Sequence, residues 1–221
     1  MARIDFLQTQ HSSTPRDYVQ RVVAHDKSHC AEVAGRFGQE YWDGERQYGY
    51  GGYRYDGRWR NLAETLIAHY QLKPGDRILD VGCGKGFLLY EFMTALPGLE
   101  IAGIDISRYG IENAKEEVRP LLQVGDARSL PYPDASFDFV LSLGTLHNLP
   151  LEGAMAAFRE IERVGRGPRK YVMVESFRTE REKMNLLYWQ LTCQSFHSPE
   201  SWAWLAAQAG YHGDHGFIFF E

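Results

Sequence analysis

The chain has 221 residues, of which 44% are hydrophobic and 24% are charged, and its formal net charge is −5. This composition excludes a wholly disordered chain, a collagen-like chain and a disulfide scaffold. No apolar run reaches the roughly 18 residues that span a bilayer, and the start of the chain has no apolar core of signal-peptide type, so we expect no membrane partner.

Strand and helix patterns alternate through the middle of the chain. We expect helices at 59–71, 86–96, 107–118, 151–165 and 199–209, and strands at 77–81, 100–105, 121–124, 138–143 and 169–176, with one more strand within 211–221. This alternation is typical of an α/β fold of Rossmann-like, doubly wound type, in which helices cover both faces of a mostly parallel sheet. We assign 59–221 to this domain and 1–58 to an N-terminal cap and lid, which is helical and rich in Tyr and Gly.

A glycine-rich loop, residues 80–86, follows the first expected strand and opens a helix. Its G-x-G-x-G spacing lacks the third glycine of a dinucleotide fingerprint, because Phe87 stands there, and it lacks the Gly-Lys-Ser/Thr of a phosphate-binding loop. Asp80 would repel a pyrophosphate but attract an ammonium group. The loop therefore favours a zwitterionic, nucleoside-containing ligand, and a plain strand–helix turn is the alternative.

Acidic residues also follow the second and third expected strands. Asp105 ends the second strand, where a carboxylate can accept both ribose hydroxyls, although it could equally support a helix N-cap. Asp126 follows the third strand and could accept from an adenine amine while the backbone N–H of Ala127 faces a ring nitrogen. A turn Asp is the alternative for this position.

Residues 78–86 resemble motif I of the class I S-adenosylmethionine-dependent methyltransferases, and 136–142 and 146–149 resemble that family's fourth strand and the loop after it. The resemblance covers about residues 60–176, and the small-molecule branch of the family is the most similar. It implies S-adenosylmethionine as cofactor, S-adenosylhomocysteine as product, and Leu143 beside the methionine portion. The expected cofactor-binding residues are Asp80, Gly82, Cys83, Gly84, Gly86, Asp105, Ile106, Asp126, Ala127, Leu143, Tyr55 and Arg58.

Methyl transfer to a hydroxyl needs a general base. His147, just beyond the fourth strand, is the first candidate, and Glu175, near the end of the fifth strand, is the second. A packing or substrate-contact role is the alternative for His147, and a solvated side chain or a contact to the N-terminal segment is the alternative for Glu175.

Residues 48–57 contain four tyrosines and four glycines. We expect this segment to form a lid, in which Arg54 or Arg58 pairs with the methionine carboxylate or with an anionic acceptor. A loop packed on the core is the alternative. By resemblance, the aromatic residues of 177–221 wall the acceptor pocket, although Trp202 and Trp204 also fit an ordinary core helix.

The expected partner is a small-molecule acceptor, such as a sugar-like or nucleotide-linked biosynthetic intermediate. We expect no nucleic-acid partner, because the acidic chain has no basic stripe. A methyltransferase acting on protein or RNA, and a non-catalytic cofactor-binding subunit, stay open as alternatives.

His25, His29 and Cys30 lack further ligands, so we expect no metal. The three widely spaced cysteines indicate a cytoplasmic protein. Only one strand remains for the far sheet edge, which is either short or covered in a homodimer.

Overall fold

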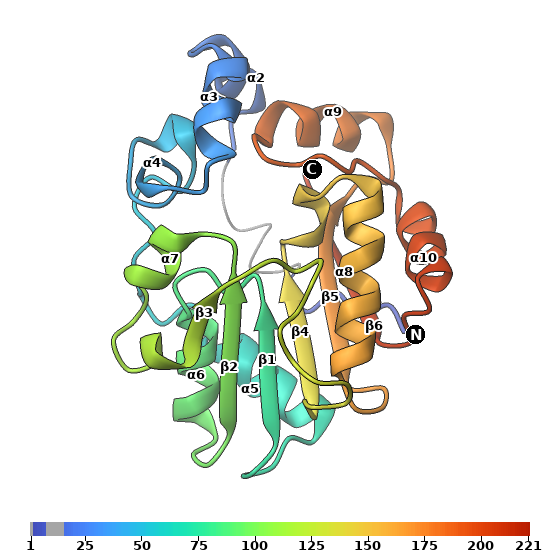
Figure 1. Cartoon of the computed structure of the whole chain (residues 1–221). Helices are drawn as coiled ribbons and strands as arrows, with labels where there is room; N and C mark the ends of the chain where they lie inside the picture. Colours follow the sequence, from blue (N-terminus) through green and yellow to red (C-terminus); the bar gives the residue numbers. More distant parts are fainter. Residues whose placement is uncertain (1, 8–15) are drawn as a thin grey trace.

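A six-stranded sheet lies at the centre of the computed structural model, which describes residues 2–7 and 16–221 (Figure 1). The strand order is β3-β2-β1-β4-β5-β6, and every neighbouring pair is parallel. The strands are β1 Arg77–Val81, β2 Glu100–Asp105, β3 Leu122–Val124, β4 Phe139–Leu143, β5 Lys170–Ser176 and β6 Asp214–Phe219. The expected Rossmann-like α/β fold is confirmed, with a sheet that is parallel throughout.

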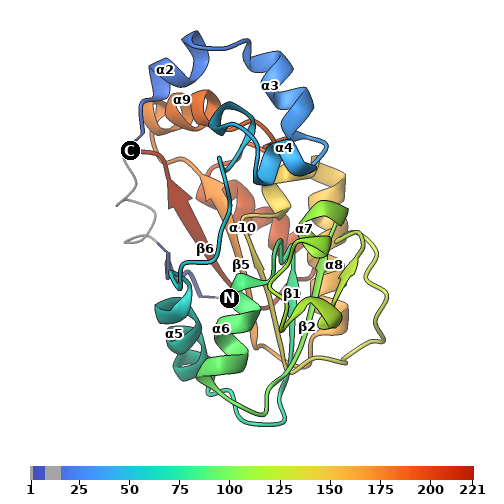
Figure 2. The same cartoon turned by 90° about the vertical axis from the view of Figure 1, so that its left-hand side faces the viewer.

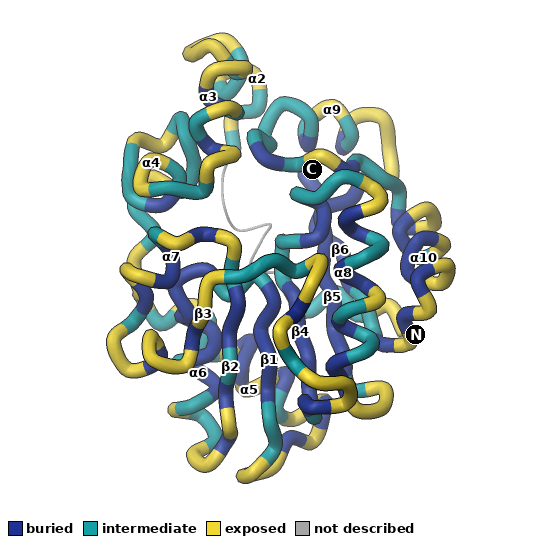
Figure 3. The backbone as a smooth tube through the Cα atoms, viewed as in Figure 1, coloured by how far each residue is buried: buried dark blue, intermediate teal, exposed yellow. Residues whose placement is uncertain are grey.

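Helices pack on both faces of this sheet (Figure 2). Helices α5 (Arg60–Tyr70) and α6 (Phe87–Ala95) cover one face, and α8 (Leu151–Val164) and α10 (Pro199–Gln208) cover the other. Successive strand residues serve opposite faces: Ile78 belongs to the core under α5 and α6, and Leu79 to the core under α8 and α10. The central strands β1, β4 and β5 are therefore buried on both sides, whereas the edge strand β3 is largely exposed (Figure 3).

Further helices stand beyond the carboxyl ends of the strands, as Figures 1 and 2 show. They are α2 Tyr18–Val23, α3 Lys27–Ala34, α4 Gln39–Trp42 and α9 Glu180–Trp189, with short 3-10 turns η1 Arg46–Tyr48 and η3 Leu146–Asn148. These elements roof the sheet edge at which ligands bind in folds of this type. In the described part of the chain, no helix combines the length and the apolar character needed to cross a bilayer.

The helix expected at 107–118 is wrong in its length. Helix α7 covers only Arg108–Glu112, and a 3-10 turn, η2 Arg119–Leu121, follows. Ser107 caps the helix as expected, because its hydroxyl accepts from the backbone N–H of Gly110 at 2.9 Å. The helix stops because the backbone N–H of Lys115 donates to the carbonyl of Lys85 in the glycine loop, 3.1 Å away, instead of continuing the helical ladder.

The far edge of the sheet is bordered by the first residues of the same chain. The backbone N–H of Ile4 donates to the carbonyl of His215 on β6 at 2.8 Å, and the N–H of Phe217 donates to the carboxylate of Asp5 at 2.9 Å. Residues 2–7, which the sequence assigned to the cap, therefore lie along β6. Residues 1 and 8–15 of that expected cap fall outside the described residues. The homodimer stays a prediction.

Candidate functional site

Two neighbouring cavities lie at the carboxyl ends of β1 and β4, where the strand order reverses. The inner cavity has a volume of about 310 Å³, and Asp80 and Glu175 are among its lining residues. The outer cavity has a volume of about 400 Å³, and Asp105 and Asp126 line it. Leu143 lines both cavities, so a single elongated ligand can occupy the two together.

The glycine loop brings its backbone directly to the cavity walls. Gly82 has a φ of +88°, and a Cβ there would collide with the side chain of Thr145. The backbone N–H groups of Gly82 and Cys83 donate to the carbonyl of Ile104 at 2.7 and 3.1 Å, which fixes the loop on β2. Gly82, Cys83 and Gly84 line the inner cavity, and their contact with a cofactor stays a prediction.

Gly86 does not belong to either cavity, contrary to the prediction. It is the N-cap residue of α6, and its missing side chain makes room for packing, because a Cβ would lie 2.8 Å from Val118 and 2.9 Å from Leu122. The third glycine of the motif therefore allows the helix to pack closely on the sheet.

Asp80 is a buried carboxyl group without a partner for one of its oxygens. Its residue is 4% exposed, and Oδ1 has no hydrogen-bond partner among the described residues. Burial, and to a smaller extent the negative charge of Asp105, raises the pKa of Asp80 to about 8. An ammonium group in the inner cavity would supply both the missing hydrogen bond and the missing charge, so this site fits the amino group of S-adenosylmethionine.

Asp105 and the residues around it form one wall of the outer cavity. The carboxylate of Asp105 accepts from the backbone N–H of Gly84 at 2.7 Å and of Ser107 at 2.8 Å. Burial raises the pKa of Asp105, and these two hydrogen bonds oppose the shift. Each oxygen keeps a lone pair, so the carboxylate can still accept ribose hydroxyls. Ile106 and Ala127, two further expected cofactor ligands, line the same cavity.

Asp126 also lines the outer cavity, but its carboxylate is already engaged. Arg128 donates to both oxygens through Nε and Nη2 at 2.6 to 3.0 Å, and its backbone N–H donates to Oδ1 at 2.8 Å. The Arg128 guanidinium lowers the pKa of Asp126, which is therefore ionised at neutral pH. An adenine amine would therefore have to share the Asp126 carboxylate with Arg128. The sequence alone did not predict this ion pair.

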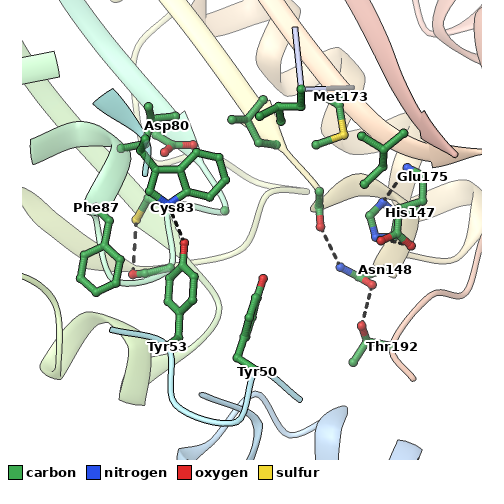
Figure 4. A pocket seen from close by; sticks show the side chains of 18 of the residues that line it. Tyr50, Tyr53, Asp80, Cys83, Phe87, His147, Asn148, Met173, Glu175 and Thr192 are labelled. Atoms are coloured by element: carbon green, nitrogen blue, oxygen red, sulfur yellow. Dashed lines mark hydrogen bonds and ion pairs between the residues drawn. The ribbon is translucent and has the colours of Figure 1, made fainter. Parts of the chain in front are cut away.

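The two candidate bases lie against each other in the inner cavity (Figure 4). His147 Nδ1 accepts from the backbone N–H of Glu175 at 3.2 Å, so the ring proton is on Nε2, which faces Glu175 Oε2 at 3.3 Å. Burial lowers the pKa of His147 to about 3 and raises that of Glu175 to about 8. The contact therefore joins two neutral groups near pH 7, although it has the distance of an ion pair.

This geometry favours Glu175 over His147 as the general base, the opposite of the order expected from the sequence. Both nitrogens of His147 lie close to Glu175, but the contact between Nε2 and Oε2 is not a hydrogen bond, and Oε2 has no hydrogen-bond partner in the described part of the chain. The other oxygen, Oε1, accepts from the side-chain amide of Gln190. Glu175 can therefore take a proton from a ligand, and His147 orients it.

The Tyr/Gly segment covers the inner cavity through an aromatic stack. Tyr50 stacks on Trp42 with ring centroids 5.3 Å apart, and Tyr53 stacks on Phe87 at 5.0 Å. All four residues line the inner cavity. The packing matches the alternative of a loop held on the core, and its movement as a lid stays a prediction.

The other two expected ligands of this segment differ from each other. Tyr55 lines neither cavity, and its hydroxyl donates to Glu91 on α6 at 2.7 Å, so the structure gives no support to its predicted cofactor contact. Arg58 lines the inner cavity but pairs with Asp56 through two nitrogens at 2.5 to 2.9 Å. A ligand carboxylate would compete with that exposed pair.

The buried side chain of Lys85 connects the glycine loop to the N-terminal segment above it. Lys85 Nζ donates to both carboxylate oxygens of Asp43, at 2.6 and 2.8 Å, and to the carbonyl of Tyr53 at 3.0 Å. Tyr109 on α7 donates to the same carboxylate at 2.9 Å. Lys85 therefore has a structural role that its place in the glycine motif did not reveal.

Sequence reasoning missed several cavity residues, because they come from segments without a motif. They are Arg16, Tyr41, Trp42, Gln190 and Thr192. The adjacent aromatic pair at 41 and 42 in an otherwise polar zone was the one available signal. Within the described residues, no three His, Cys, Asp or Glu side chains gather in a way that could hold a metal ion.

Comparisons with known proteins agree with this geometry. A family model described as a methyltransferase domain matches residues 79–167. The 27-O-demethylrifamycin SV methyltransferase of Amycolatopsis mediterranei (strain S699) is 38% identical over 96 residues, which are 40% of this chain and 35% of that protein. The demethylmenaquinone methyltransferase of Staphylococcus aureus (strain JH9) is 31% identical over 160 residues, which are 66% of this chain and 64% of that protein. The YcgJ protein of Bacillus subtilis shares the fold, with a TM-score of 0.57 at 21% identity over 67% of each chain.

The chain thus spans less than two thirds of the length of these two curated relatives. The family match includes the glycine loop, Asp105, Asp126 and His147, whereas Glu175 and the Tyr/Gly segment lie outside it. Motif, sheet topology and family match agree: residues 79–167 match a methyltransferase domain, and the fold is that of the class I S-adenosylmethionine-dependent type.

Proposed function

We propose that the protein transfers a methyl group from S-adenosylmethionine to a small-molecule acceptor. The observation that carries this proposal is the unpartnered, buried oxygen of Asp80 at the junction of the glycine loop and the inner cavity. Asp80 would hold the amino group of the cofactor, Arg58 its carboxylate, and Asp105 its ribose, with the adenine in the outer cavity. When bound, the cofactor supplies an electrophilic methyl group and leaves as S-adenosylhomocysteine.

Glu175 is the proposed general base for a hydroxyl acceptor. Glu175 lies across the inner cavity from Asp80, as Figure 4 shows, and its Oε2 has no hydrogen-bond partner among the described residues. The ionised carboxylate takes the hydroxyl proton while the acceptor oxygen forms its new bond to carbon. A pKa of about 8 makes Glu175 a stronger base than an ordinary carboxylate, at the cost of being mostly protonated at pH 7.

The enclosure of the site supports a small acceptor over a protein or RNA. Residues from the Tyr/Gly segment and from the chain after α9 line the inner cavity on its open side, including Tyr50, Tyr53 and Thr192. A cavity of about 310 Å³ holds part of a drug-sized ligand. The small-molecule methyltransferases among the relatives are consistent with this proposal. The free cysteines support a cytoplasmic setting.

The experiment that tests the function has two parts. Calorimetry with S-adenosylhomocysteine measures cofactor binding, and a panel of hydroxylated, nucleotide-linked and carboxylated small molecules is then screened by S-adenosylhomocysteine release. Binding together with turnover on at least one compound supports the proposal. Absence of binding refutes it, and tight binding without turnover on small molecules or on protein and RNA substrates indicates a non-catalytic partner subunit.

A further inference from the structure

A third cavity adjoins the inner cavity on the side of Glu175, and arginines dominate its walls. Its volume is about 320 Å³, and it is lined by Arg16, Arg21, Arg46, Arg54, Arg58, Tyr50, Tyr53, Trp189 and Glu175, among others. We call it the arginine cavity. None of the expected cofactor ligands except Arg58 lines it, so it extends away from the cofactor side of the site.

Three guanidinium groups of the arginine cavity surround one indole ring. The guanidinium carbons of Arg16, Arg21 and Arg46 lie 5.4 to 5.5 Å from the ring centroid of Trp189. Helix α9 supplies this ring, whereas the arginines come from the N-terminal segments that pack against it. Aromatic contact of this kind orients guanidinium groups, and it does not neutralise their charge.

Two arginines of this cluster, Arg21 and Arg46, have no acidic partner among the described residues. Arg21 donates to the carbonyls of Trp189 and Arg46, and Arg46 donates through Nη1 to the carbonyls of Gly49 and Tyr50. In the described part of the chain, no carboxylate lies within ion-pair distance of Arg21 or Arg46. Both keep nitrogens that take no part in these hydrogen bonds, so donors remain for a ligand.

The positive charges of this cluster are partly buried and repel one another, and a bound anion would offset this repulsion. Arg21 is half-buried, and burial together with the charge of Arg46 lowers its pKa. Glu175 is the only carboxylate that lines this cavity among the described residues, and burial keeps it mostly protonated near pH 7.

We propose that the arginine cavity binds a carboxylate or phosphate group of the methyl acceptor, and so selects anionic acceptors. This inference rests on the proposed function. Arginine forks match both oxyanions, which makes these two groups the chemistry the cavity recognises. Because Glu175 and Arg16 line both the inner and the arginine cavity, an acceptor held by its anionic end can reach the general base with another part of the molecule.

The test uses three simple probes on protein saturated with S-adenosylhomocysteine. Phenyl phosphate and benzoate represent the two anion classes, and benzyl alcohol is the neutral match. Isothermal titration calorimetry should give a dissociation constant at least about tenfold lower for one of the anions than for benzyl alcohol, since a hydrogen bond to a charged group supplies that difference. The stronger of the two anions identifies the class of acceptor.

The matched variants separate a binding role from a structural one. Arg21→Gln combined with Arg46→Gln should abolish the preference for the anion, while Arg108→Gln, which removes an exposed guanidinium on α7, should leave it unchanged. The double Lys variant keeps the charge and should retain most of the preference, which guards against misfolding of the Gln pair. S-adenosylhomocysteine binding should stay the same throughout.

Two results would overturn the inference and leave the proposed function standing. One is equal binding, or no binding, of anionic and neutral probes by protein that binds S-adenosylhomocysteine. The other is an anion preference that persists in the Gln pair. Failure of wild-type protein to bind S-adenosylhomocysteine would instead refute the proposed function, and the inference with it.

Discussion

Replacing Asp80 with Asn removes a titratable group from the inner cavity and keeps the size and shape of the side chain. In the wild-type protein, burial raises the pKa of Asp80 from 3.8 to about 8. A bound ammonium group favours the ionised carboxylate and returns this pKa toward its ordinary value. Binding of S-adenosylhomocysteine should therefore release the proton of Asp80.

The size of this release follows from the pKa. At pH 7, roughly nine tenths of the Asp80 side chains are protonated in the free protein, and at pH 9 roughly one tenth are. Binding should release about 0.9 proton at pH 7 and about 0.1 at pH 9. Asp80→Asn should release none, and it should bind about 10- to 100-fold more weakly, because a charge-assisted hydrogen bond contributes about 1.5–3 kcal/mol.

The number of protons is measured by calorimetry in buffers of different ionisation enthalpy. Asp126→Asn is the matched control, because Asp126 is paired with Arg128 and already ionised, so it has no proton to release. A wild-type protein that releases no proton at pH 7, or an Asp80→Asn variant that releases as many as wild type, would show that Asp80 does not receive the amino group.

Three further predictions concern the base, the loop and the core. With a hydroxylated acceptor, Glu175→Gln should lower the rate of S-adenosylhomocysteine release about 10²- to 10⁴-fold, and the wild-type rate should fall about tenfold per pH unit below pH 7 as Glu175 gains its proton. Gly82→Ala should abolish cofactor binding in calorimetry, whereas Gly38→Ala, with no atom within 4 Å of its added Cβ, should not. Trp202→Ala should lower the free energy of unfolding in urea by about 3–5 kcal/mol, and Trp204→Ala, 61% exposed in wild type, by less than about 0.5 kcal/mol.

Each of these has an outcome that contradicts it. A Glu175→Gln variant with the wild-type rate and pH profile would remove the base. Normal affinity in Gly82→Ala would mean that the loop relaxes around the added methyl group. Similar losses of stability for the two tryptophan variants would contradict the assignment of Trp202 to the core.

The sheet was predictable because its strands are short apolar runs that end in glycine or acidic residues. β1 and β2 lie where the pattern placed them, and α8 follows its apolar spacing from Leu151. Helix α7 was not predictable, because its end depends on a hydrogen bond between Lys115 and Lys85, which are 30 residues apart in sequence. Patterns of local sequence carry no information about such a contact.

The cofactor side of the site was largely predictable, whereas the acceptor side was not. Asp80 and Asp105 follow strands directly, so the topology brings them to the same sheet edge. The arginine cavity is assembled from five separate stretches of the chain, and the spacing of Arg21, Arg46 and Trp189 gives no sign that they meet. The order of the two bases depended on a backbone hydrogen bond to His147, which only the three-dimensional arrangement shows.

The amino-terminal residues that run beside β6 have a practical meaning for handling the protein. They satisfy backbone groups that would otherwise offer a template for another chain, and Leu7, at the end of the same stretch, is part of the inner cavity wall. Shortening the chain at this end should therefore promote self-association and weaken ligand binding at once.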